Sequence, residues 1–420
     1  MMGAREEFSR GWTIIVAGAF GMAFGISALP FYTLGIFVKP IGDEFGWSRE
    51  TVQWGFATQM LGMLVVGWFY GLMSDRIGAR RVALCSQFGL AAGFAALSFT
   101  SGLAWWYGAW FLLALLGAGT SPITWTRGVS VWFDRARGAA LGLALLGTGI
   151  TGLLAPPLVT AIIAEWGWRA AYLAIAASIL LIAVPVVWLL FKDREAPPAH
   201  EAAMLAEGAS VREAFANYRF YILLIVFAAI TFGVGGIIPN LVPLLTDRGL
   251  QPAEAAGYAS VAGLAVIIGR VLAGFLIDRF WAPGVAFFFL ALPALSCFVL
   301  AQPGLPAPVV IGIAAGLVGL AAGAEFDLIA FIVSRYFGMR NYGLLYAIQM
   351  LALLFAGGLA PPVFGRIYDV TGSYSSILYI SAGLFIVAPL LLLTLGRYPE
   401  RKSGAVPEDA VAAPSAAPAV

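Results

Sequence analysis

The sequence predicts an all-α membrane protein with twelve transmembrane helices, arranged as two pseudo-symmetric bundles of six. Three observations support this prediction. The 420 residues are 61% hydrophobic and only 11% charged, with a mean hydropathy of +0.91, whereas soluble domains carry about 25% charged residues. Apolar windows of about 20 residues, the length of a helix that spans a bilayer, recur along the whole chain. Short motifs of the first half also return in the second half.

We place the helices at apolar runs bounded by charged residues or by Gly/Pro-marked breaks. A short N-terminal segment (1–11) precedes the N-terminal bundle (12–191), which contains runs at 12–37, 51–73, 82–101, 105–132, 138–163 and 169–191. A polar cytoplasmic linker (192–218) leads to the C-terminal bundle (219–396), which contains runs at 219–245, 255–277, 283–301, 308–333, 341–365 and 375–396. The Pro/Ala-rich tail (397–420) is predicted to be disordered.

The distribution of Lys and Arg predicts the orientation of the chain in the membrane. If both termini lie on one side, seventeen of these residues fall on that side, five fall on the other, and Arg127 and Arg270 lie inside helices. Cytoplasmic loops carry the excess of Lys and Arg. Both termini are therefore expected in the cytoplasm, with the chain in the inner (plasma) membrane.

Two motifs of the first half return in the second. GLMSDR at 71–76 returns as GFLIDR at 274–279, and LAPP at 154–157 returns at 359–362, so that the offsets are 203 and 205 residues. Motifs that return at a nearly constant offset indicate two homologous bundles. Transporters built in this way hold their substrate between the repeats.

The loop between the second and third predicted helices, GLMSDRIGARR (71–81), combines glycines with charged residues. Gly71 and Gly78 permit tight turns and close helix approach, and Asp75 can cap a helix N-terminus or pair with an arginine of the other bundle. The loop resembles the signature of the major facilitator superfamily, and this resemblance covers nearly the whole chain. It implies that the loop and its echo bias inward-open against outward-open states; a tight loop with a purely structural role is the alternative. The predicted gating residues are Gly71, Asp75, Arg76, Gly78, Arg80, Arg81, Asp278 and Arg279.

Two further segments resemble the branch of that superfamily that contains monocarboxylate transporters and oxalate/formate exchangers. They are WFDRARGAALGLALLG at 132–147 and ALPFYTLGIFVKPIGDEFGWSRE at 28–50. The resemblance implies that the arginine of the eighth helix, here Arg270, binds the substrate carboxylate. The chain departs from the animal carriers at Phe31, where they have a lysine, and at Val266, where they have an aspartate. Their proton relay therefore cannot be transferred to this sequence.

Arg270 is also unusual on physical grounds, because it lies inside the apolar stretch GLAVIIGRVLAGFLIDRF (263–280). It is two turns from Asp278 and Arg279, roughly 12 Å along a helix, and a charge at the bilayer centre costs at least ~2.5–3.5 kcal/mol. The guanidinium stays protonated at physiological pH, and its fork suits a carboxylate held in a water-filled cavity. The alternative is a permanent ion pair with an acid on a neighbouring helix.

The tenth predicted helix carries two acids, Glu325 and Asp327, inside its apolar run. Two positions correspond to about 200° around a helix, so at most one acid is expected to meet the cavity, and the other to brace a helix contact. Either acid could couple transport to a proton by exchanging Arg270 for it, and structural ion pairing is the alternative. Arg127 is expected at the inner mouth of the path or at the membrane interface. The other candidate substrate ligands, each of which could instead make an interhelical hydrogen bond, are Tyr32, Asn240, Tyr346 and Gln349.

The predicted function is secondary active transport of a small organic monocarboxylate, coupled to a proton and performed by alternating access of the two bundles. The alternatives are proton-driven efflux of amphipathic compounds and exchange of a dicarboxylate for a monocarboxylate. The sequence has no GxSxG, HExxH, CxxC or phosphate-loop motif, so we expect no enzyme activity, cofactor or ATP drive. Cys85, Cys297 and the single His200 predict no metal site, and the net charge of +2 predicts no nucleic-acid partner. The expected partners are the organic anion, a proton and membrane lipid, and the chain is expected to be a monomer.

Overall fold

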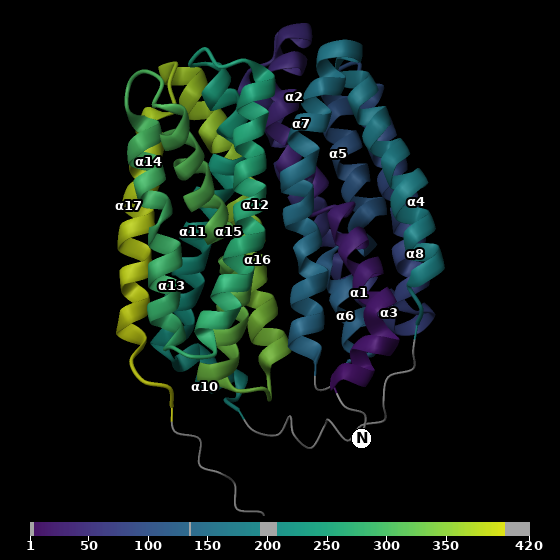
Figure 1. Cartoon of the computed structure of the whole chain (residues 1–420), viewed down its shortest axis with the longest axis vertical. Coiled ribbons are helices and arrows are strands. Elements are labelled where there is room, and N and C mark those ends of the chain that lie inside the picture. Colours follow the sequence, from purple (N-terminus) through teal and green to yellow (C-terminus); the bar gives the residue numbers. More distant parts are fainter. Residues whose placement is uncertain (1–3, 134–135, 194–207, 400–420) are drawn as a thin grey trace, which may run out of the picture.

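The computed structural model describes residues 4–133, 136–193 and 208–399, and only the backbone of Ala4, Gly71 and Asp75. In Figure 1 the N-terminal half, in purple to blue, and the C-terminal half, in green to yellow, stand side by side as two groups of long helices. The first and last described residues and the short helix α10 lie at one end, which we call the terminal face. The other end is called the opposite face. Most of the predicted tail, and linker residues 194–207, lie outside the described residues.

The helices of the described residues follow the predicted apolar runs. The N-terminal half contains α1 (Ala4–Ala23), α2 (Leu29–Phe45), α3 (Arg49–Ile77), α4 (Ala79–Ser98), α5 (Leu103–Gly117), the 3-10 turn η1 (Ala118–Thr120), α6 (Pro122–Ser130), α7 (Arg137–Ser178), the π-helical turn η2 (Ile179–Ala183) and α8 (Val184–Leu190). The C-terminal half contains α10 (Val211–Ala216), α11 (Tyr218–Thr246), α12 (Pro252–Ile277), α13 (Ala282–Ala291), α14 (Pro293–Ala301), α15 (Pro308–Phe337), α16 (Tyr342–Thr371), α17 (Ser375–Leu392) and the 3-10 turn η3 (Leu393–Leu395).

Ten helical stretches of the described residues are long and apolar enough to cross a membrane. The stretch Arg137–Leu190 is 54 residues long and contains two helices, because Gly167 has φ 78° and ψ 169° and interrupts α7. Helices α1 and α2 together cover the first predicted run. The fold is therefore the all-α membrane architecture that the sequence predicts, and this division is consistent with twelve passes.

Some predicted helices are broken. The backbone groups left unpaired at one break form hydrogen bonds with residues of neighbouring helices. Between α1 and α2, the backbone amide of Ile26 donates to Thr120 Oγ1 of η1 (3.0 Å), and Gln59 Nε2 donates to the carbonyl of Ile26 (3.1 Å). A Cβ atom on Gly25 would lie 2.7 Å from the carbonyl oxygen of Thr120, so glycine allows this approach. Because lipid offers no hydrogen bonds, the unpaired backbone groups of one broken helix need polar partners from its neighbours.

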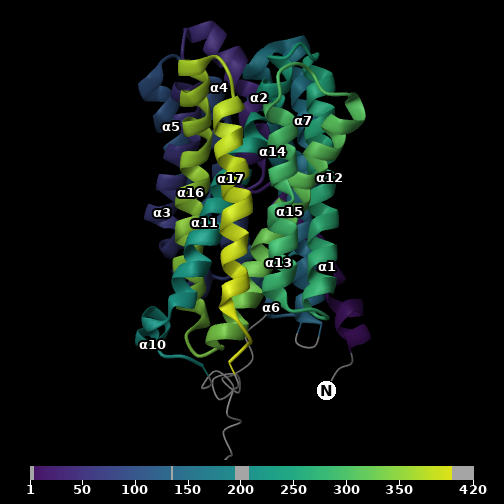
Figure 2. The same cartoon turned by 90° about the vertical axis from the view of Figure 1, so that its left-hand side faces the viewer.

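The two bundles contact each other along three helix pairs: α7 with α12, α3 with α16, and α2 with α11. Figure 2 shows the first pair, with α7 and α12 next to each other. Glycines set the closest approaches: a Cβ atom on Gly263 would lie 2.1 Å from the carbonyl carbon of Gly152, and one on Gly35 would lie 1.6 Å from the carbonyl oxygen of Pro239. The backbones of the two bundles therefore touch at residues that have no side chain.

Large apolar side chains occur both inside and outside the bundles. Trp106, Trp110 and Phe94 are fully buried, whereas Trp68, Leu181 and Trp188 are largely exposed. Lipid tails are as apolar as leucine, so a membrane-embedded surface does not need to hide such residues. The exposed set therefore marks the lipid-facing surface.

Candidate functional site

Arg270 lies on α12 at the boundary between the bundles. Its side chain is 7% exposed, and its Nε lies 3.4 Å from Oδ2 of Asp327 on α15. One terminal nitrogen, Nη1, donates to the carbonyl of Leu145 on α7 of the other bundle (2.9 Å), and Nε makes a long contact of 3.5 Å with the carbonyl of Gly323. The guanidinium is thus buried within the protein rather than directed at lipid. It contacts an acid of its own bundle and a carbonyl group of the opposite bundle.

The ion pair does not use the full guanidinium fork. The shortest contact of Asp327 with the guanidinium is at Nε, and no hydrogen bond joins Nη2 to a described residue. A bidentate carboxylate pair, the strongest arrangement open to arginine, would use two parallel N–H bonds. The geometry therefore includes the ion pair that the sequence analysis raised as an alternative, but it leaves part of the guanidinium without a carboxylate partner.

Glycines bring Arg270 and Asp327 together by allowing α12 and α15 to approach closely. A Cβ atom on Gly323 would lie 2.1 Å from the carbonyl oxygen of Val266, and one on Gly319 would lie 2.2 Å from that of Ala262. At such a backbone distance, a long cationic side chain on one helix reaches an acid on the next. The small residues of these apolar helices thus position the charged pair.

The two acids of α15 point to different partners. Asp327 pairs with Arg270, whereas Glu325 is 2% exposed and accepts a hydrogen bond from Thr231 Oγ1 of α11. This is the separation expected for residues two positions apart on a helix. Asp327 therefore belongs to the site around Arg270, and Glu325 belongs to the contact between α11 and α15.

Two tyrosines surround the charged pair, one from each bundle. Tyr32 of α2 and Tyr346 of α16 both lie within range of the charge of Arg270, and Tyr346 also lies within range of Asp327. The ring of Tyr346 stacks on Tyr342 with 5.4 Å between centroids. A site made of α2, α7, α12, α15 and α16 draws residues from both bundles, so relative motion of the bundles must change it.

Three other predicted ligands lie elsewhere. Gln349 is fully buried, and its Nε2 donates to the carbonyl of Phe220 within the C-terminal bundle (3.1 Å). Asn240 is also buried and joins the opposite-face contact described below. Arg127 lies in the last turn of α6 and is exposed. The structure therefore brings together Arg270, Asp327, Tyr32 and Tyr346, and the substrate-binding roles of all these residues stay predictions.

A network of polar residues joins the bundles near the opposite face, and sequence reasoning missed it. We call it the opposite-face cluster; its members are Arg49, Gln53, Asn240, Asp247, Asp369 and Tyr374. Arg49 Nη1 and Nη2 bind the two carboxylate oxygens of Asp247 at 2.6 and 2.7 Å. Arg49 Nη1 also donates to the hydroxyl of Tyr374 (2.9 Å). The arginine belongs to the N-terminal bundle and both partners to the C-terminal bundle, so this contact spans the boundary.

Two more connections complete the opposite-face cluster. The carboxylate of Asp369 accepts hydrogen bonds from the backbone amides of Arg49 (3.2 Å) and Glu50 (2.9 Å), so an acid of α16 caps the N-terminus of α3. Such a position suits an anion, because helix N-termini carry unpaired N–H groups and a partial positive charge. Gln53 Nε2 donates to Asn240 Oδ1 (2.6 Å). The bundles are thus bonded together on this face.

Tyr374 helps to fix the charge of the opposite-face cluster. Its hydroxyl donates to Asn240 Oδ1 (3.1 Å), and burial raises the pKa of Tyr374 above its ordinary value. The phenol therefore stays neutral at physiological pH. The cluster then depends on the charges of Arg49, Asp247 and Asp369.

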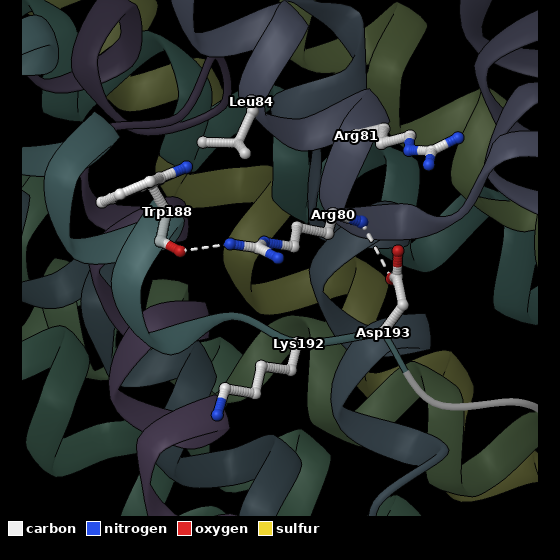
Figure 3. A pocket seen from close by; sticks show the side chains of 6 residues that line it. All are labelled: Arg80, Arg81, Leu84, Trp188, Lys192 and Asp193. Carbon is white, nitrogen blue, oxygen red and sulfur yellow. Dashed lines mark hydrogen bonds between the residues drawn. The ribbon is translucent and has the colours of Figure 1, made fainter.

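The predicted gating residues lie near the terminal face and contact their own bundles. Gly78 has φ 91° at the junction of α3 and α4, and the backbone amide of Arg80 donates to Asp193 (3.0 Å), as Figure 3 shows. Arg279 packs over the ring of Phe275 on the same helix, with 3.5 Å from the guanidinium carbon to the ring centroid. The side chain of Asp75 lies outside the described part. The gating role of these residues stays a prediction.

Comparison with known proteins identifies the class to which this fold and site belong. The family model of the Major Facilitator Superfamily matches residues 20–324, which is more than half of the chain. The chain belongs to this superfamily, and it is a multi-pass membrane transporter. Within the superfamily, the chain is similar to curated proteins of the monocarboxylate-transporter branch.

Several of these relatives are named monocarboxylate transporters. The chain is 29% identical over 411 residues to monocarboxylate transporter 11 of Homo sapiens, covering 92% of this chain and 83% of that protein. It is 26% identical over 404 residues to monocarboxylate transporter 13 of Rattus norvegicus, covering 92% and 89%. Among solved structures, an inward-facing, unoccupied bacterial homologue of the human lysosomal transporter Spinster has a TM-score of 0.69 at 17% identity, covering 95% of this chain and 100% of that chain. This last likeness concerns the fold.

Proposed function

We propose that the protein carries a small organic monocarboxylate across the plasma membrane by alternating access, and that Arg270 binds the carboxylate. The observation that supports this most is the position of Arg270: it is buried at the boundary of the bundles and contacts both of them. A fixed positive charge at this depth needs a negatively charged partner. Several relatives are named monocarboxylate transporters, and these names agree with the proposal.

The charges at the site support coupling of transport to a proton. Without substrate, Arg270 and Asp327 together are neutral. A bound carboxylate would add one negative charge to a buried site, where an uncompensated charge is costly. A proton on Asp327 removes that charge and releases Nε of Arg270. One proton would therefore accompany each monoanion. We assign the coupling role to Asp327 rather than Glu325, because Glu325 contacts Thr231 instead of the arginine.

Alternating access requires the two faces to open in turn. The opposite-face cluster bonds the bundles on one side, so substrate can enter from that side only after its contacts break. The excess of Lys and Arg near the terminal face supports a cytoplasmic location for that face. We therefore assign the opposite-face cluster to the outer barrier, and the segment 71–81 with its echo at Asp278 and Arg279 to the inner one.

Uptake of labelled carboxylates into proteoliposomes, with and without an imposed pH gradient, tests the proposal. We expect Arg270→Gln to abolish uptake, and Arg270→Lys to retain little of it because lysine lacks the planar fork. Asp327→Asn should lose stimulation by the pH gradient yet still exchange labelled for unlabelled substrate. Glu325→Gln is the matched control, since it changes an acid on the same helix outside the site, and it should retain proton-driven uptake.

The thermal stability of each variant separates loss of function from loss of fold. Full uptake by a stable Arg270→Gln protein would overturn the carboxylate assignment and would favour efflux of uncharged amphipathic compounds, which does not need the arginine. Proton-driven uptake by Asp327→Asn, together with its loss in Glu325→Gln, would transfer the coupling role to Glu325.

A further inference from the structure

A pocket at the terminal face is lined by three cations and one acid. It lies between the start of α4 and the end of α8, away from Arg270, and has a volume of about 420 Å³. Figure 3 shows the residues that line it. They are Arg80, Arg81, Leu84, Trp188, Lys192 and Asp193.

The one acid of the pocket has its own partners. Asp193 accepts a hydrogen bond from the backbone amide of Arg80 (3.0 Å) and packs against Gly78, where a Cβ atom would lie 2.3 Å from its carboxylate. The guanidinium of Arg80 donates from Nη2 to the carbonyl of Trp188, while its buried Nε has no hydrogen-bond partner among the described residues. A buried N–H without an acceptor is costly. An acceptor with several oxygens would satisfy it.

Two further cations reach the pocket, Arg81 from α4 and Lys192 from the segment that follows α8. Arg81 and Lys192 are both exposed, and no ion pair joins either one to a described acid. With Arg80 they give three positive charges around one carboxylate. A phosphate group carries negative charge and several strong acceptor oxygens, and arginine and lysine are its usual ligands in proteins. The electrostatics of the pocket therefore favour a phosphate-bearing anion.

The surface above the pocket is apolar and exposed. On α4, Leu84 in the pocket is followed one turn later by Phe88, which is 55% exposed. On the neighbouring helix, Trp188 of α8 is 60% exposed. Leu181 of η2, two turns farther from the terminal face, is 75% exposed. Residues four or seven apart share a face of a helix. The pocket thus opens onto a lipid-facing apolar surface formed by both helices.

We propose that this pocket binds the headgroup of an anionic phospholipid. Its phosphate lies among Arg80, Arg81 and Lys192, and its acyl chains follow the apolar surface past Phe88 and Leu181. Basic pockets at the cytoplasmic ends of transmembrane helices are suited to such headgroups. A free phosphate would satisfy the same cations but would gain nothing from the apolar surface. The bound lipid would also hold the start of α4 against the end of α8.

Titration of the delipidated full-length protein with lipid, followed by native mass spectrometry and by thermal stability, tests this site. Phosphatidylglycerol is the probe, phosphatidylcholine is the lipid with no net charge, and inorganic phosphate is the soluble anion. The double variant Arg81→Gln/Lys192→Gln removes the two exposed cations and leaves Arg80 in place. Its matched control is Arg5→Gln/Arg212→Gln, which removes two exposed cations near the same face but outside the pocket.

We expect the pocket variant to bind phosphatidylglycerol on the order of 30-fold more weakly, from two surface cations, and to lose the stabilisation that this lipid gives. The control variant should bind like the unchanged protein. Equal binding of phosphatidylglycerol by both variants, or no preference for it over phosphatidylcholine, would overturn the proposal. Stabilisation by inorganic phosphate that matches the lipid would show a soluble-anion site instead and would overturn it as well. Unchanged stability of the pocket variant in phosphatidylcholine shows that it is folded.

Discussion

Removing the negative charge of Asp247 should weaken the closed state of the opposite face. In Asp247→Asn, the amide can keep one hydrogen bond to Arg49, but the bidentate ion pair with bonds of 2.6 and 2.7 Å is lost. The two side chains are only 15% and 17% exposed, so solvent screens them little. A hydrogen bond to a charged group contributes about 1.5–3 kcal/mol. The lower end of this range applies, because Tyr374 and Asp369 still hold Arg49.

A loss of about 1.5 kcal/mol corresponds to about a tenfold change in the ratio of closed to open molecules. Distances between spin labels across the opposite face would show this change directly. Asp43→Cys, at the end of α2, and Gln251→Cys, before α12, place one exposed label on each bundle. The two native cysteines, Cys85 and Cys297, are replaced by serine in this background. We expect a larger fraction of long distances in Asp247→Asn.

Glu44→Gln is the matched control. Glu44 pairs with Arg169 at 2.7 Å, but both residues belong to the N-terminal bundle, so loss of this pair should leave the distance between bundles unchanged. An unaltered distance distribution in Asp247→Asn, or an equal shift in Glu44→Gln, would refute the assignment of the cluster as a barrier. The double variant Arg49→Gln/Asp247→Asn should shift the distribution by less than the sum of the two single variants, because neighbouring changes that act on one contact are not additive.

Two other predictions concern packing. Gly263→Ala should lower both thermal stability and uptake, because a Cβ atom there would lie 2.1 Å from the backbone of Gly152; Gly274→Ala, with no atom within 4 Å of the added Cβ, should have little effect. Thr120→Val should lower the free energy of unfolding by about 1–3 kcal/mol, because the buried amide of Ile26 loses its acceptor. Wild-type stability in Gly263→Ala or in Thr120→Val would show that the surrounding helices adapt.

Much of the architecture could be predicted from the sequence, because burial in lipid demands long apolar runs and closed backbone hydrogen bonds. The twelve runs overlap the observed helices throughout the described residues. The irregular turns that divide four of these runs were missed. The run 12–37 is interrupted near Gly25, where the backbone groups depend on Thr120 and Gln59 from other helices. Hydrophobicity along one segment carries no information about such partners.

The site could be predicted in part. Arg270 is conspicuous because it is a charge inside an apolar run, and its depth follows from counting residues along a helix. Which of the two acids, Glu325 or Asp327, faces Arg270 depends on the rotation of α15 about its axis. The glycine contacts between α15 and α12 determine this rotation. Arg49 gave no such signal, because a charged residue at the end of a helix is ordinary. Its partners Asp247 and Asp369 lie in the other half of the chain, and only the packing of the bundles brings them together.

The carboxylate of Asp369 completes the first turn of a helix that belongs to the other half of the molecule. When the halves separate, the exposed amides of that turn must immediately find new acceptors, and bulk water is the available supply. Separation of the halves and entry of water between them are therefore expected to occur together. In the proposed mechanism, a solute that arrives from this side would therefore meet water between the halves before it reaches Arg270.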